Sequence, residues 1–163
     1  MSQEEVVIEP MQADDISQVA ILFTEDMDDL GVETTKEHML ELAEGVFEAT
    51  HSDSPECLCF VARLGEDDEA VGVVLANFNW SLKFSGRALW LEELYVTPRA
   101  RRRGLGRILV ETVLDWAEEN DIRGIDLEAY RGNTPASILY RSLGFHRMGR
   151  ERFYYRVQGS EFL

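Results

Sequence analysis

Residues 90–111 read WLEELYVTPRARRRGLGRILVE, and three parts follow one another in this stretch. Residues 90–96 form a short run of apolar and aromatic residues, which is typical of a buried strand. Thr97-Pro98 ends that strand, because proline has no N–H for a ladder hydrogen bond. An arginine-rich turn with two glycines comes next. The apolar residues from Leu105 onward recur at i, i+3 and i+4 spacing, which predicts an amphipathic helix.

The turn between this strand and this helix has the chemistry of an anion site. The chain has a formal net charge of −15, yet five of its 16 cationic residues lie here: Arg99, Arg101, Arg102, Arg103 and Arg107. A helix start exposes N–H groups and the positive end of the helix dipole. Gly104 and Gly106 let a ligand approach the backbone, and arginine is well suited to phosphate. The turn therefore predicts a bound polyanion.

The turn differs from two common phosphate-binding loops. No Gly-Lys-Ser/Thr follows, so the turn is not a Walker loop. No third glycine follows Gly106, so it is not a dinucleotide-binding fingerprint. A nucleic-acid patch or a solvated helix start remains the alternative interpretation of so basic a run.

Two motifs resemble the GCN5-related N-acetyltransferase family. Arg101-x-x-Gly104-x-Gly106 after a strand is similar to the family's acetyl-CoA pyrophosphate loop, Arg/Gln-x-x-Gly-x-Gly/Ala. Further along, residues 133–145 resemble its Asn-x-x-Ala-x-x-x-Tyr-x-x-x-Gly-Phe block, with Asn133, Ala136 and Tyr140 at the matching positions. The resemblance covers roughly residues 57–157. It implies an enzyme that transfers the acetyl group of acetyl-CoA to an amine, with acetyl-CoA as cosubstrate and no metal.

The expected fold is α/β, with a mixed sheet, in one domain over residues 1–163. The pattern predicts strands at residues 6–8, 58–63, 70–80, 89–96, 125–129, 145–148 and 152–157. It predicts helices from Asp14 or Asp15 to residue 30, from a capping box at Thr34-x-x-Glu37, after Gly104, and over 135–143. The resemblance implies the acyl-CoA N-acyltransferase fold, a central mixed sheet of about six to seven strands flanked by about four helices. In that fold the fourth and fifth strands separate to admit the pantetheine arm.

The resemblance also implies roles for individual residues. Pantetheine contacts the backbone of Leu94, Tyr95 and Val96, and the Val96 N–H is the expected oxyanion donor. The pyrophosphate lies against the turn formed by Arg101, Arg102, Arg103, Gly104, Leu105, Gly106 and Arg107. Asn133 and Ala136 flank CoA. Tyr140 is expected to contact the cofactor and to act as the general acid toward the departing thiolate.

Acetyl transfer to an amine requires a base, because the free amine is protonated near neutral pH. Residues 91–96, Leu-Glu-Glu-Leu-Tyr-Val, resemble the Leu-Glu-Asp-Phe-Phe-Val of diamine (spermidine/spermine) acetyltransferases, whose first acid is the proposed base and substrate ligand. We therefore expect Glu92 to be the base and Glu93 an acceptor-site carboxylate. Adjacent residues on a strand face opposite sides unless a bulge intervenes, so the choice between them stays open. Arg102 and residues 152–157 depart from the diamine group.

Further carboxylates are candidates for binding the acceptor. Asp28 belongs to an acidic cluster at the end of the first predicted helix, and Asp126 and Glu128 lie on the strand after the central helix. The expected acceptor is a small cationic amine, polyamine-like or diamine-like. The alternatives are a protein N-terminal or lysine acetyltransferase, an aminoglycoside acetyltransferase, or a non-catalytic acetyl-CoA-binding module. A solvated helix end is the alternative interpretation of the acidic cluster.

The composition excludes several classes. The strong acidity argues against nucleic acid and anionic membrane as partners. No apolar run is long enough to cross a membrane, and the acidic start MSQEEVVIEP does not resemble a signal peptide, so a cytoplasmic location is expected. Cys57 and Cys59 are the two cysteines, too few for a disulfide framework or a four-ligand zinc site, and we expect buried free thiols. The three histidines show no metal-ligand spacing. Exposed sheet edges near the C-terminus allow a homodimer.

Overall fold

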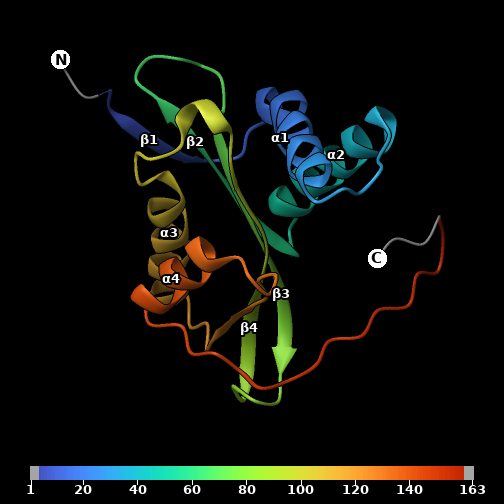
Figure 1. The fold of residues 1–163 in the computed structure, drawn as a ribbon, viewed down its shortest axis with the longest axis vertical. Coiled ribbons are helices and arrows are strands. Elements are labelled where there is room, and N and C mark those ends of the chain that lie inside the picture. Colours follow the sequence, from blue (N-terminus) through green and yellow to red (C-terminus); the bar gives the residue numbers. More distant parts are fainter. Residues whose placement is uncertain (1–3, 160–163) are drawn as a thin grey trace. The chain divides into compact units, whose positions relative to one another are not determined.

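The computed structural model describes residues 4–159, and the chain divides into two compact units, Met1–Glu128 and Ala129–Leu163. The first unit contains the whole sheet and three of the helices (Figure 1). Its strands are β1 (Val6–Pro10), β2 (Cys57–Leu64), β3 (Gly72–Ser81), β4 (Gly86–Val96) and β5 (Ile125–Leu127). Its helices are α1 (Ile16–Asp29), α2 (Lys36–His51) and α3 (Leu105–Glu119), with short 3₁₀ turns at Ala13–Asp15 and Pro98–Ala100.

The sheet is mixed. Its strands lie in the order β1-β2-β3-β4-β5, each antiparallel to its neighbour except β5, which runs parallel to β4. The long antiparallel pairs follow from apolar runs joined by short turns, and β5 requires the crossover helix α3 because parallel strands cannot be joined by a hairpin. The α/β mixed-sheet prediction is thus confirmed, with five strands in the described part of the chain.

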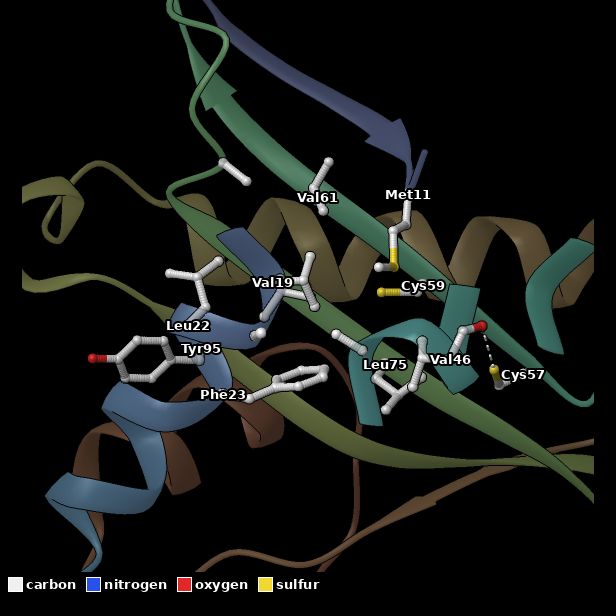
Figure 2. Close-up of a cluster of buried hydrophobic side chains, with 14 residues drawn as sticks. Met11, Val19, Leu22, Phe23, Val46, Cys57, Cys59, Val61, Leu75 and Tyr95 are labelled. Atoms are coloured by element: carbon white, nitrogen blue, oxygen red, sulfur yellow. Dashed lines mark hydrogen bonds between the residues drawn. The ribbon is translucent and has the colours of Figure 1, made fainter. Parts of the chain in front are cut away.

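Helices cover both faces of this sheet. In Figure 1, α1 and α2 lie on one face and α3 on the other. Figure 2 shows the core under α1 and α2, where Val19, Leu22 and Phe23 of α1 pack against Val61 and Leu75 of the sheet. Under α3 a smaller core contains Leu64, Val71, Ala100 and Leu105, so the arginine-rich turn begins and ends on a buried residue. The alternation of strand side chains assigns each residue to one of these cores.

The two cysteines are buried free thiols, as predicted. Both belong to the core under α1 and α2, and the Cys57 thiol contacts the Val46 carbonyl oxygen at 3.8 Å (Figure 2). Burial raises the pKa of Cys57 to about 11 and raises that of Cys59 further. Thiols that stay protonated at neutral pH are poor nucleophiles, so neither cysteine is a candidate for covalent catalysis.

The start of α2 differs from the predicted capping box. Thr35, not Thr34, is the N-cap, and its hydroxyl accepts a hydrogen bond of 3.1 Å from the His38 N–H. The hydroxyl of Thr34 is buried without a hydrogen-bond partner among residues 4–159. Either of two adjacent threonines can supply an N-cap hydroxyl, so the sequence alone does not decide between them.

The second unit contains one helix within the described residues, α4 (Thr134–Ser142). The strands predicted at residues 145–148 and 152–157 are wrong for the described chain, where these residues form no regular structure. Phe153, Tyr155 and Val157 are 85%, 90% and 85% exposed. A strand needs a ladder partner, and the described residues of this unit include no second strand to supply one.

Candidate active site

The backbone of β4 is paired on one side only over its last residues. Parallel pairing to β5 runs from Leu89↔Ile125 to Leu91↔Leu127, whereas β4 continues to Val96. Beyond Leu91 the strand β4 has no ladder partner on this side within residues 4–159, because β5 ends at Leu127. Backbone groups on this open side of β4 are therefore not used by the sheet.

The N–H groups of Leu94 and Val96 point toward this open side. Thr97 N–H donates to the Val71 oxygen at 2.9 Å, so the amide of Thr97 points toward the β3 side. Successive amides alternate along a strand, so those of Glu93 and Tyr95 also point toward β3 and those between them point away. Of the three predicted pantetheine contacts, Leu94 and Val96 thus have backbone N–H groups on the open side and Tyr95 does not, although the Leu94 N–H also hydrogen-bonds to the Glu93 carboxyl.

A β-bulge at Glu92 explains this alternation. Leu75 pairs with Glu93 and Ala76 with Leu91, so Glu92 is the extra residue on β4. Before the bulge, Leu89 N–H donates to the Gly124 oxygen at 3.0 Å, on the β5 side, so the direction of the odd-numbered amides reverses across Glu92. The bulge therefore decides which amides of β4 reach the open side.

The bulge also decides where the two adjacent glutamates lie. The Trp90 indole N–H donates to the Glu92 carboxylate at 2.9 Å, and the register opposite Asn77 assigns Trp90 to the same sheet face as Leu75. Glu93 pairs directly with Leu75 and shares its face. Glu92 and Glu93 therefore both lie on the α1 face, although they are adjacent in sequence.

Glu93 forms a carboxyl pair with Asp26 of α1. Burial is the main reason that the pKa of Glu93 rises to about 9; a hydrogen bond to Asp26, the Asp26 charge and the Glu92 charge add to it, while the Leu94 backbone amide lowers it. The pKa of Asp26 is also raised, first by burial and then by Asp29, against the lowering effects of Glu93 and Arg101. The two carboxyls lie within hydrogen-bond reach of each other, and the raised pKa of Glu93 favours its protonated form at neutral pH.

A neighbouring carboxylate ties α1 to β4. Glu25 accepts hydrogen bonds from the Tyr95 hydroxyl at 3.0 Å and from the Thr97 hydroxyl at 2.9 Å. Burial and Glu25 raise the pKa of Tyr95, which therefore stays a neutral donor. Glu93, Tyr95 and Thr97 alternate along the chain, so all three meet the same face of α1.

The arginine-rich turn has the backbone geometry of an anion site at a helix start. Gly104 is the N-cap of α3 in the left-handed conformation, with φ of 77°, and a Cβ there would meet no heavy atom within 4 Å. Arg102 also has a positive φ, of 66°, a conformation that glycine adopts more easily. The exposed turn leads the chain to the first N–H groups of α3, which have no partner inside the helix.

The arginines of the turn differ in their partners. Arg101 donates through Nε to the Val96 oxygen at 2.9 Å, and its guanidinium lies 3.6 Å from Asp29. Other arginines pair with acids outside the turn: Arg99 with Glu69 at 3.1 Å, Arg103 with Glu4 at 3.0 Å, and Arg107 with Glu111 at 3.3 Å. Arg102 is exposed and has no ion pair within residues 4–159. All of these pairs are about half exposed, and such surface pairs contribute little stability, so an anion can compete for the arginines.

The three remaining acceptor candidates are either exposed to solvent or already held in an ion pair. Asp28 is exposed on the last turn of α1. Asp126 pairs with Lys83 at 2.6 Å, and Glu128 is exposed just after β5. Asp26, one turn before Asp29, belongs to the same acidic cluster as Asp28, but sequence reasoning chose Asp28 from that cluster as the site residue. The signal for Asp26 is its spacing from the buried Leu22 and Phe23, at i+4 and i+3, which assigns it to the inner half of the helix.

The second unit has its own predicted residues. The Asn133 side chain caps α4 by accepting a hydrogen bond of 3.3 Å from the Ala136 N–H. The Tyr140 ring contacts the Phe145 ring edge-on, with centroids 5.7 Å apart. Asn133 and Ala136 are thus joined in one helix start, and Tyr140 lies on the same helix.

Comparison with known proteins gives the family. Residues 20–145 match the Acetyltransferase (GNAT) family. The chain belongs to this family. That match begins in α1 and ends after α4, so it includes the Asp26–Glu93 pair, the arginine-rich turn and Tyr140 of this GNAT chain.

Named relatives include acetyltransferases with different acceptors. N-alpha-acetyltransferase RimI of Mycobacterium tuberculosis is 42% identical over 66 residues, 40% of this chain and 40% of that protein. Streptothricin acetyltransferase of Streptomyces lavendulae is 31% identical over 103 residues, 63% of this chain and 51% of that protein. The chain therefore spans about half or less of these GNAT relatives.

Solved structures show the same fold. The aminoglycoside N-acetyltransferase AAC(6')-Iy in complex with CoA superposes with a TM-score of 0.78 at 20% identity, covering 96% of this chain and 98% of that one. Within residues 4–159 of this GNAT chain, no helix is long and apolar enough to cross a membrane. No group of three or more metal-binding side chains occurs in the same described range.

Proposed function

We propose that this GNAT protein is an acetyl-CoA-dependent N-acetyltransferase acting on a primary amine of a small cationic acceptor. The observation that carries the proposal is the juxtaposition on β4 of two features. The open backbone edge at Leu94 and Val96 runs directly into the anion site at the start of α3, and Glu93 lies on the α1 face of the same strand.

The residues of the turn fit the pyrophosphate of acetyl-CoA. Gly104 leaves space above the backbone, the first N–H groups of α3 supply donors, and Arg102 and Arg103 add positive charge. The Val96 N–H, directed to the open side, is suited to the oxyanion that develops on the acetyl group. Asn133 and Ala136 remain candidates to flank CoA.

We assign the role of general base to Glu93 in preference to Glu92. Glu93 is partly buried and its pKa is about 9, whereas Glu92 is exposed and bonded to Trp90. A base with this pKa is matched to an alkylammonium, whose pKa lies at about 10.4 in lysine. Glu92, Asp29 and Asp28 then supply negative charge around a cationic acceptor.

Each proton in the proposed reaction has a donor and a destination. Glu93 takes one proton from the ammonium, and the neutral nitrogen attacks the acetyl carbonyl carbon, forming the C–N bond. Collapse breaks the C–S bond, and the thiolate takes a proton from Tyr140. The second nitrogen proton and the proton on Glu93 leave to solvent, and Tyr140 regains a proton from solvent. Each turnover of an ammonium acceptor thus gives an acetamide, CoA and one proton.

A protein N-terminus is the second candidate acceptor. Its support is the RimI relative, named as an N-alpha-acetyltransferase. An α-amino group has a pKa of about 7.7–8.0, so it needs less help from a base than a polyamine does. Streptothricin and aminoglycosides, the acceptors in other names, are cationic amines like the first candidate.

The test is product formation from acetyl-CoA with a panel of acceptors, followed by mass spectrometry of the acetylated product. The panel contains spermidine, short diamines, aminoglycosides, and peptides with a free N-terminus or lysine. Turnover with one class identifies the acceptor. Binding of acetyl-CoA without turnover on any member contradicts the proposal and favours a non-catalytic binding module.

Variants test the assigned residues. Glu93→Gln should lower kcat by about 10²–10⁴ while leaving acetyl-CoA affinity unchanged, and Tyr140→Phe should also lower kcat. Glu92→Gln should cost less than Glu93→Gln. If Glu92→Gln is the more damaging of the two, the base is Glu92, as the diamine resemblance implied.

A further inference from the structure

We infer that Asp26 on α1 is a positioning residue for the general base, because its carboxyl lies against the Glu93 carboxyl and thereby sets the pH range in which the enzyme works. The inference rests on the proposed role of Glu93 and deepens it. Asp26 does not touch the reacting atoms in this scheme. It acts through the carboxyl that does.

The geometry holds Asp26 against β4 from both sides. Immediately before it, Glu25 accepts hydrogen bonds from Tyr95 and Thr97, at 3.0 and 2.9 Å. One turn after it, Asp29 lies 3.6 Å from the Arg101 guanidinium, and Arg101 itself donates to the Val96 oxygen. Contacts to β4 and to the turn after it thus fix this stretch of α1. These contacts hold the backbone that carries Asp26 close to the face of β4 on which Glu93 lies.

The charges around the pair explain why it keeps a proton. Glu92 on β4, and Glu25 and Asp29 on α1, are acids, and Arg101 from the arginine-rich turn is the cation that lowers the pKa of Asp26. Two partly buried carboxylates side by side repel each other, so ionising both is unfavourable. Burial, the Asp26 hydrogen bond and the Asp26 charge, in that order, raise the pKa of Glu93 to about 9.

This arrangement has a consequence for catalysis. A lone carboxylate of ordinary pKa is too weak a base to take a proton readily from an alkylammonium. The doubly ionised pair is a stronger base, and it returns to the singly protonated state when it accepts the acceptor's proton. A consequence is that the doubly ionised pair, which is the active form, becomes abundant only as the pH rises toward the pKa of Glu93.

The experiment compares the pH profile of kcat/KM for the wild type and Asp26→Asn, using one acceptor throughout. Asparagine removes the charge of Asp26 and cannot share a proton with Glu93. The rise of kcat/KM with pH should therefore occur at lower pH, with its midpoint shifted by about one pH unit or more. The plateau at high pH should be lower, because the remaining base is weaker. Asp115→Asn, an exposed aspartate of α3, removes the same charge and should leave the midpoint in place.

A conservative variant separates positioning from folding. Asp26→Glu keeps a carboxyl, so the pH at which its kcat/KM rises should be closer to the wild-type value than that of Asp26→Asn. A midpoint unchanged in Asp26→Asn, in an enzyme that Glu93→Gln inactivates, overturns the role of Asp26 and leaves Glu93 as the base. Full activity of Glu93→Gln overturns the proposed base itself, so the two failures are distinguishable.

Discussion

At the residue scale, Glu93 links catalysis to stability. Its pKa is about 9 in the folded protein, against an ordinary value of 4.5, so the folded state binds its proton more tightly than the unfolded state does. The resulting stability is fully present below pH 4.5 and is lost as the pH rises through about 9. A tenfold difference in proton affinity between the folded and unfolded states corresponds to about 1.4 kcal/mol of stability.

This predicts a melting temperature that falls between about pH 5 and pH 9 in the wild type. Glu93→Gln has no carboxyl to ionise, so its melting temperature should be flatter over the same range. For a chain of this size, 1 kcal/mol corresponds to about 2–4 °C. Thermal unfolding followed by circular dichroism in a series of buffers measures both curves. Parallel curves for the two proteins would show that Glu93 titrates normally.

Arg102 combines backbone strain with a functional charge. It has φ of 66°, where a side chain costs about 1 kcal/mol relative to glycine. Arg102→Gly should therefore keep or raise the melting temperature while raising the KM for acetyl-CoA several-fold. Arg99→Gly, in the same turn but already paired with Glu69, is the comparison variant and should change KM less. A loss of stability in Arg102→Gly without a change in KM would contradict this account.

At the element scale, the start of α2 offers a matched pair of variants. Thr35→Ala removes the N-cap hydroxyl that accepts from His38 and should cost about 1 kcal/mol. Thr34→Val replaces a buried hydroxyl that has no partner within residues 4–159, so it should be neutral or stabilising. Urea denaturation of both variants measures the difference. If Thr34→Val is instead the more destabilising of the two variants, Thr34 is the N-cap, as the sequence predicted.

The elements also show what sequence reasoning can reach. The strands at β2, β3 and β4 and the helix α3 follow from local apolar patterns, and Arg101-x-x-Gly104-x-Gly106 identified the turn. The bulge at Glu92 depends on how β4 registers against β3, and the Asp26–Glu93 pair depends on how α1 packs. Neither is a local property. The aromatic residues in 152–157 suited a strand, but composition alone does not supply a ladder partner.

At the scale of the whole molecule, the net charge of −15 should dominate the response to salt. Excess like charge destabilises the compact state, and the screening length falls from about 30 Å at 0.01 M to about 3 Å at 1 M. The melting temperature at about pH 7.5 should therefore rise by several degrees as NaCl increases. Near the sequence pI of about 4.5 the effect should shrink. An equal effect at both pH values would point to a cause other than charge repulsion.

The bulge gives β4 one residue more than its pairing with β3 requires. Leu91 and Glu93 pair with Ala76 and Leu75, which are neighbours on β3, so the ladder on either side of Glu92 does not depend on that residue. Loss of Glu92 would close the bulge, leave Glu93 opposite Leu75 and keep the Leu94 and Val96 amides directed as they are. In genetic terms, an in-frame deletion of codon 92 should cost little more than the loss of the Glu92 carboxylate.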